Sequence, residues 1–178
     1  FVEDDFARVW LIGIIRIMLP ELAEEIGVYA LSGDSRAYTV HQSHRINPAT
    51  AGIRSLCILD GDSSREEDLG SDVLKLPGRV PESSIFDYVH GDIDVLAMKL
   101  AIALHLPPEK EIEVKKVVNE VSLSNRDPHL LFNQVGQGLG YIASSIVESA
   151  FVSLWVDGNP TEATRIAEFI RDRADKDT

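Results

Sequence analysis

Two aspartates that follow a short apolar stretch are the residues of this chain best suited to chemistry. Asp60 and Asp62 flank Gly61 directly after residues 56–59, a pattern that indicates a buried strand ending in a tight turn. Two carboxylates held so close repel each other unless a proton or a cation lies between them. A hard divalent ion such as Mg²⁺ prefers oxygen ligands and keeps several waters. The alternative interpretation is a solvated Asp-Gly turn.

Further acids follow other expected strands. Glu3 comes directly after the first apolar residues, and Glu82 follows the expected strand at 73–76. Because the carboxyl ends of parallel strands meet at one edge of a sheet, these acids are expected to converge with Asp60 and Asp62. Such a set could hold one or two cations that polarise a phosphate and lower the pKa of a bound water. The sequence therefore predicts Mg²⁺- or Mn²⁺-dependent phosphoryl chemistry.

The elements that must position these acids form an α/β pattern. A parallel four-stranded sheet flanked by helices is expected over residues 1–90, and a helical subdomain over residues 91–178. A helical segment is expected over residues 4–26, in which Pro20 either kinks the helix or begins a new one that runs to residue 25. The expected strands cover residues 1–2, 28–31, 55–59 and 73–76, and the later helices cover residues 93–106, 109–121, 130–156 and 161–174.

Residues 35–50 show no clear hydrophobic period, so they are expected to form a loop. This stretch is locally cationic, with Arg36, His41, His44 and Arg45. It is interpreted either as a solvated loop or as a phosphate contact beside the metal site.

Composition limits the class of protein. The 178 residues are 44% hydrophobic and 26% charged, as in ordinary globular domains, and the formal net charge is −12. This charge argues against a self-sufficient nucleic-acid-binding module, although other domains could supply the grip on DNA. The single cysteine, Cys57, lies within an expected strand, which is typical of a core residue in the reducing cytoplasm.

The start of the chain predicts a fragment. Phe1 already reads as part of a strand, no charged leader precedes an apolar block, and we expect a piece of a longer protein without a signal peptide. The apolar stretch at residues 9–22 is short and interrupted, so no membrane partner is expected.

The order of the acidic motifs resembles the Toprim domain of topoisomerases, primases and related nucleases. In that family a Glu ends the first strand and Asp-x-Asp ends the third, as Glu3 and Asp60-Gly61-Asp62 do here. The first residues, Phe-Val-Glu-Asp-Asp-Phe-Ala, and the later Leu-Pro-Gly with Pro-Glu are most similar to the overcoming-lysogenization-defect family of ATP-dependent endonucleases. The resemblance covers about the first half of the chain.

The resemblance implies a metal-dependent DNA endonuclease that works with an ATPase domain or subunit, with phage defence as one role of such proteins. It implies Glu3, Asp60, Asp62 and Glu82 as metal ligands, the first three also being catalytic. The chain departs from the family at Asp4, where a Gly is usual, and at Ala7, where some members carry a second acid. The late catalytic lysine of the family has no clear equivalent, and Arg126 or His129 are its candidate replacements. Homodimerisation through the helical half is a further expectation.

Two rival hypotheses remain open from the sequence. In a phosphatase of the haloacid dehalogenase type, Asp60 would be the covalent nucleophile and Asp62 the general acid. That class needs its motif near the chain start, whereas 59 residues precede Asp60 here. In a catalytically degenerate Toprim module, the same scaffold would serve only for interaction with a partner.

Overall fold

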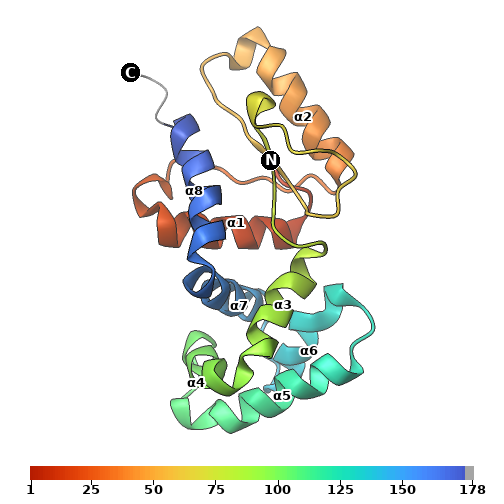
Figure 1. Ribbon diagram of the computed structural model, residues 1–178, viewed down its shortest axis with the longest axis vertical. Coiled ribbons are helices and arrows are strands. Elements are labelled where there is room, and N and C mark those ends of the chain that lie inside the picture. Colours follow the sequence, from red (N-terminus) through yellow and green to blue (C-terminus); the bar gives the residue numbers. More distant parts are fainter. Residues whose placement is uncertain (175–178) are drawn as a thin grey trace. The chain divides into compact units, whose positions relative to one another are not determined.

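The computed structural model describes residues 1–174, which divide into two compact units. Unit 1 combines residues 1–81 with the last helix, from residue 160 onward, and unit 2 comprises residues 82–159. The sequence analysis instead divides the chain once, at residue 90. The difference arises because the last helix, α8 (Pro160–Ala174), packs against α1 (Asp5–Met18) and so belongs with the first unit (Figure 1).

The sheet of unit 1 is smaller than expected. Strands β1 (Cys57–Leu59) and β2 (Val73–Lys75) pair in parallel and are the only strands in residues 1–174. Single parallel bridges join Val2 to Ala30 on one side and to Ile58 on the other. Four segments therefore run parallel in the order Ala30, Val2, β1, β2, but only two are long enough to count as strands. The described residues thus form a two-stranded parallel sheet with two flanking bridges within a mostly helical chain, and the expected four-stranded sheet is not shown.

Helix α1 begins where the sequence predicts and ends earlier. The Asp4 side chain accepts a hydrogen bond from the Ala7 amide at 2.8 Å, which caps the helix, and Trp10 and Ile14 on its inner face are fully buried. The expected helix continues to residue 26, but α1 stops at Met18 because Pro20 cannot continue the hydrogen-bond ladder. A short 3₁₀ turn, η1 (Pro20–Leu22), follows.

Helix α2 (Asp34–Ile46) replaces the loop expected over residues 35–50, so that prediction is wrong. Only Ala37 and His41 of this helix are buried. Because the buried face is so narrow, apolar residues do not recur at helical spacing in this stretch of the sequence. The hydrophobic pattern therefore does not predict the helix. The remaining 3₁₀ turns of unit 1 are η2 (Pro48–Thr50) and η3 (Leu69–Ser71).

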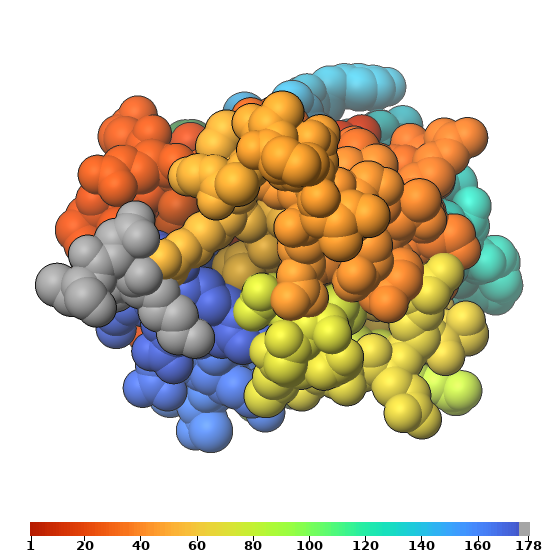
Figure 2. Space-filling view, turned by 90° about the horizontal axis from the view of Figure 1, so that it is seen from above, coloured from red at the N-terminus to blue at the C-terminus, as the bar shows by residue number. Residues whose placement is uncertain are grey.

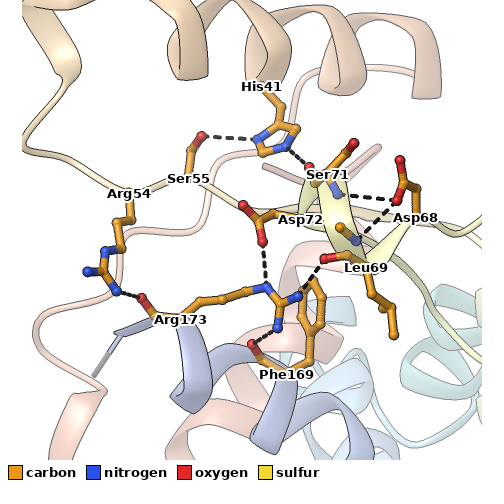
Figure 3. A network of polar contacts seen from close by, with 10 residues as sticks. His41, Arg54, Ser55, Asp68, Leu69, Ser71, Asp72, Phe169 and Arg173 are labelled. Carbon is orange, nitrogen blue, oxygen red and sulfur yellow. Dashed lines mark hydrogen bonds and ion pairs between the residues drawn. The ribbon is translucent and has the colours of Figure 1, made fainter. Parts of the chain in front are cut away.

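Polar contacts fasten α2 and α8 to the segments that flank the strands (Figure 3). The buried His41 ring bonds Ser55 Oγ at 3.0 Å and the Ser71 carbonyl at 2.8 Å. On α8, the Arg173 guanidinium bonds the Asp72 carboxylate at 2.6 Å and the Leu69 carbonyl at 2.7 Å. Helices and strands of unit 1 are thereby joined by side chains as well as by the apolar core.

Unit 2 is helical, as the sequence predicts for most of this region. Its core contains Phe86, Phe132 and Phe151, with the rings of Phe86 and Phe151 stacked at 5.7 Å between centroids. Its elements are α3 (Pro81–Gly91), which starts one residue before the unit, α4 (Ile93–Ala103), η4 (Pro108–Lys110), α5 (Glu111–Ser124), η5 (Pro128–Leu130), α6 (Leu131–Gly138) and α7 (Ser144–Gly158). Among residues 1–174, none of the helices has the length and apolar character needed to cross a membrane.

Candidate functional site

Glu3 lies at the same edge of the sheet as the Asp-Gly-Asp turn. Its backbone follows Val2, which is bridged to Ile58, and its Oε1 accepts a hydrogen bond from the Asp60 amide at 2.9 Å. The carbonyl of Glu3 accepts a further bond from the Gly33 amide at 2.8 Å. The parallel arrangement thus brings residues far apart in the sequence to one place, as the strand-end pattern predicts.

The turn after β1 is fixed by a close backbone approach at Gly61. A Cβ at this position would lie 1.6 Å from the Gly78 carbonyl oxygen, so no other residue fits without movement of the backbone. Asp60 is 7% exposed, whereas Asp62 on the other side of Gly61 is exposed to solvent. The two carboxylates therefore have different environments, one largely desolvated and one in water.

Asp34 is a fourth acid at this edge that the sequence analysis does not single out. It begins α2 directly after the turn at Ser32 and Gly33, where φ is 57° and 126°, and its Oδ2 accepts a hydrogen bond from Ser63 Oγ at 3.0 Å. This bond is the main reason that the pKa of Asp34 is lowered from its ordinary value. The signal in the sequence is its place one turn after the expected second strand, matching Asp60 after the third.

The electrostatics of the edge are unfavourable for another negative charge. The pKa of Glu3 is raised, first by burial and then by the nearby charges of Asp34, Asp62 and Asp4, while the bond from the Asp60 amide acts in the opposite direction. A carboxyl group in such a place is relieved either by a proton or by a bound cation.

The geometry is only partly that of a preformed metal site. Within residues 1–174, no three His, Cys, Asp or Glu side chains are grouped so as to hold a metal ion together. The acids at this edge nevertheless suit Mg²⁺ or Mn²⁺, because each offers carboxylate oxygens and one of them, Asp60, is buried. Mg²⁺ is commonly bound by one or two carboxylates, with waters and substrate phosphates completing its shell.

The remaining predicted site residues belong to unit 2. Glu82, on α3, is 5% exposed, and its Oε1 accepts a hydrogen bond from His129 Nδ1 at 2.6 Å. His129 follows the Asp127 cap of η5 and its side chain is 69% exposed. The Arg126 guanidinium donates to the Leu123 and Asn125 carbonyls at 3.1 and 2.8 Å. Glu82 is therefore paired with His129, whereas Arg126 bonds backbone carbonyls at the C-terminal end of α5.

The cationic stretch of the sequence is distributed along α2. His41 points inward and bonds protein groups with both ring nitrogens, so it is a structural residue and cannot contact a phosphate there. Burial lowers the pKa of His41, which keeps the ring neutral. Cys57 is likewise a core residue, because burial raises the pKa of its thiol to about 11.

Comparisons of this chain with protein-family models, with curated proteins and with solved structures found no match.

Proposed function

We propose that this chain is the nuclease part of a divalent-metal-dependent DNA endonuclease with a Toprim-like core. The observation that carries the proposal is the 2.9 Å hydrogen bond from the Asp60 amide to Glu3 Oε1, which joins the two acidic motifs at one sheet edge. The raised pKa of Glu3 supports it, because the edge gains from a bound cation.

Each acid has a role in this proposal. Glu3, Asp60 and Asp62 would provide oxygens for Mg²⁺ or Mn²⁺, with Asp34 adding charge at the same edge. A bound ion of this type supplies polarisation of a phosphate and a lowered pKa for water. In an alternative assignment the two aspartates hold the ion and Glu3 accepts a proton from water, a role that suits its raised pKa.

Within unit 2, Glu82 and His129 form a carboxylate–imidazole pair. His129 Nδ1 contacts the Glu82 carboxylate at 2.6 Å, so the orientation of Glu82, which stays a predicted metal ligand, depends on that imidazole. Arg126 and His129 are still proposed as catalytic residues, in place of the late lysine of the family.

The proposed partners are DNA and an ATPase domain or subunit. With a net charge of −12, the chain by itself should bind DNA weakly, and a further domain would strengthen its hold on the substrate. Homodimerisation through the helical half also stays a prediction. The exposed apolar stripe of α4, formed by Val95, Met98 and Ile102, is a surface of unit 2 that suits it.

Cleavage of supercoiled plasmid tests the proposal. With Mn²⁺ or Mg²⁺ we expect the chain to nick DNA, and we expect Glu3→Gln, Asp60→Asn and Asp62→Asn to abolish nicking while keeping a cooperative melt. Glu109→Gln, at an exposed acid of η4, is the matched control and should cleave like the wild type. Cleavage by Asp60→Asn at the wild-type rate would refute the proposal. Phosphate trapped covalently on Asp60 would instead identify a phosphatase.

A further inference from the structure

Arg65 is a cation beside the acidic edge that forms no salt bridge with any residue the structure describes. It lies in the loop that follows Asp60, and among residues 1–174 its guanidinium forms no salt bridge. In contrast, Arg165, Arg171 and Arg173 of α8 each bond a carboxylate. The charge of Arg65 helps to lower the pKa of the nearby Asp34, but no carboxylate in the described part of the chain lies within salt-bridge distance, so the half-buried guanidinium can still bind another anion.

The backbone of Arg65 is tied to the acidic edge. Its amide donates to Ser63 Oγ at 3.2 Å, and the same hydroxyl donates to Asp34 at 3.0 Å. The Ser63 amide in turn bonds the Asp60 carbonyl at 3.2 Å. The loop is thereby wound against the turn that carries the acids, and Arg65 cannot lie far from them.

The side chain of Arg65 is fixed by the first turns of α2. Its guanidinium carbon lies 4.2 Å from the centroid of the Tyr38 ring, and Nη2 lies 3.5 Å from Ser35 Oγ. Stacking on an aromatic face restricts the plane of the guanidinium and leaves its edge to donate hydrogen bonds. Figure 2 shows α2 (orange) next to the loop that follows β1 (yellow) on one face of the molecule.

The donors of this guanidinium are only partly used. Within residues 1–174, the buried Nε has no hydrogen-bond partner, and the contact with Ser35 is at the limit of a hydrogen bond. Such unsatisfied donors are rare in folded proteins and call for an explanation. An anionic ligand bound between Arg65 and the acidic edge would accept hydrogen bonds from these donors and so explain them.

We propose that Arg65 binds the non-bridging oxygens of the phosphodiester at the acidic edge. This inference rests on the proposed nuclease function and names the group that holds the substrate there. The carboxylates repel a phosphate on their own, so a fixed cation next to them is needed to seat it. A planar guanidinium suits this task, because it can donate two parallel hydrogen bonds to one phosphate. Tyr38 is the positioning residue that keeps the guanidinium in place.

Four variants of the full chain test the proposal. Arg65→Ala removes the guanidinium, Arg65→Lys keeps only the charge, and Tyr38→Leu removes the stacking ring. Arg16→Ala is the matched control, because Arg16 is an exposed arginine on α1 roughly 16 Å along that helix from Asp5. Melting curves identify any variant that fails to fold. If Arg65→Ala is such a variant, Arg65→Lys and Tyr38→Leu test the role of Arg65 in its place.

Cleavage rates and phosphate binding are both measured. We expect Arg65→Ala to lower kcat by about 10²–10³-fold, with partial activity in Arg65→Lys, smaller loss in Tyr38→Leu and none in Arg16→Ala. In Ca²⁺, affinity for a short DNA duplex should fall at least about tenfold for Arg65→Ala. If the wild type does not cleave, the nuclease proposal fails. The role of Arg65 is then tested only by the DNA-binding measurement in Ca²⁺. Binding and cleavage by Arg65→Ala equal to those of Arg16→Ala would overturn the role of Arg65.

Discussion

Glu3 is the residue at which the two acidic motifs meet. Its side chain accepts a hydrogen bond from Asp60, and its charge is opposed by Asp34, Asp62 and Asp4. The bond orients the carboxylate, whereas the neighbouring charges and burial disfavour its ionised form. A residue under these two influences responds to pH and to cations more strongly than an ordinary surface acid.

The pH dependence of stability should reveal this state of Glu3. Its pKa is raised above the ordinary 4.5, so just above pH 4.5 the folded chain binds more protons than the unfolded chain. The contribution of Glu3 to the free energy of unfolding therefore falls as pH rises through this interval. Urea unfolding from pH 4 to 8, without divalent ions, should show Glu3→Gln gaining stability relative to the wild type as pH increases. A relative loss would contradict the raised pKa.

Single residues of the site were predictable where a motif marks a strand end. Asp60, Gly61 and Asp62 follow β1, and Glu3 follows the segment that bridges to it, because buried strands leave a continuous apolar signal. Asp34 follows the expected second strand and carries the same kind of signal, whereas the position of Arg65 depends on α2 and on the fold of the loop after β1. No local pattern in the sequence encodes these contacts.

At the scale of elements, α2 shows how a helix can be held by one polar residue. The Ser71 carbonyl can only accept, so His41 Nε2 carries the proton and Nδ1 accepts from the Ser55 hydroxyl. This single buried side chain connects α2 to the residues before β1 and before β2. The apolar contact of α2 with the core is small, because Ala37 is its only buried apolar residue, and so the hydrophobic pattern does not predict the helix.

Replacement of His41 should therefore loosen α2. His41→Leu leaves the Ser71 carbonyl and the Ser55 hydroxyl without their partner, which costs about 1–3 kcal/mol of unfolding free energy. The folded-state pKa of His41 lies below the ordinary 6.5, so wild-type stability falls as pH drops through 6.5 and this part of the pH dependence should vanish in the variant. Denaturant unfolding at pH 5 and pH 7.5 measures both effects. His105→Gln, at an exposed histidine, should leave both unchanged.

The strands were predicted in place but not in length. Val2 and Ala30 lie where strands are expected, yet Ala30 forms one isolated bridge and Val2 two, and neither segment extends into a strand. Ser32 and Gly33, with positive φ, end the second segment at once. Hydrophobic runs show which segments are buried, but the number of paired residues depends on neighbours that the local pattern does not specify.

At the scale of the whole molecule, unit 1 is built from the two ends of the chain. Helix α8 packs on α1, and Arg173 bonds Asp72 and the Leu69 carbonyl. The sequence marks α8 as an amphipathic helix, but the face it covers lies more than a hundred residues earlier, which no short window can show. The units therefore differ from a division into two consecutive halves.

Removal of α8 should destabilise unit 1. Truncation after Asn159 exposes the face of α1 and the apolar side of β2, so we expect a lower melting temperature and increased binding of a hydrophobic dye. A milder variant, Arg173→Ala, removes the ion pair with Asp72 while keeping the helix, and should cause a smaller decrease. A truncated chain with an unchanged melt would show that α8 does not contribute to unit 1.

Binding of Mn²⁺ to the full chain, followed by electron paramagnetic resonance, tests the shared acidic edge most directly. The wild type and Glu109→Gln should bind the ion with equal affinity, while Glu3→Gln and Asp60→Asn should each weaken binding by at least about tenfold, or 1.4 kcal/mol. Equal affinity in all four proteins would contradict a cation site formed jointly by Glu3 and Asp60.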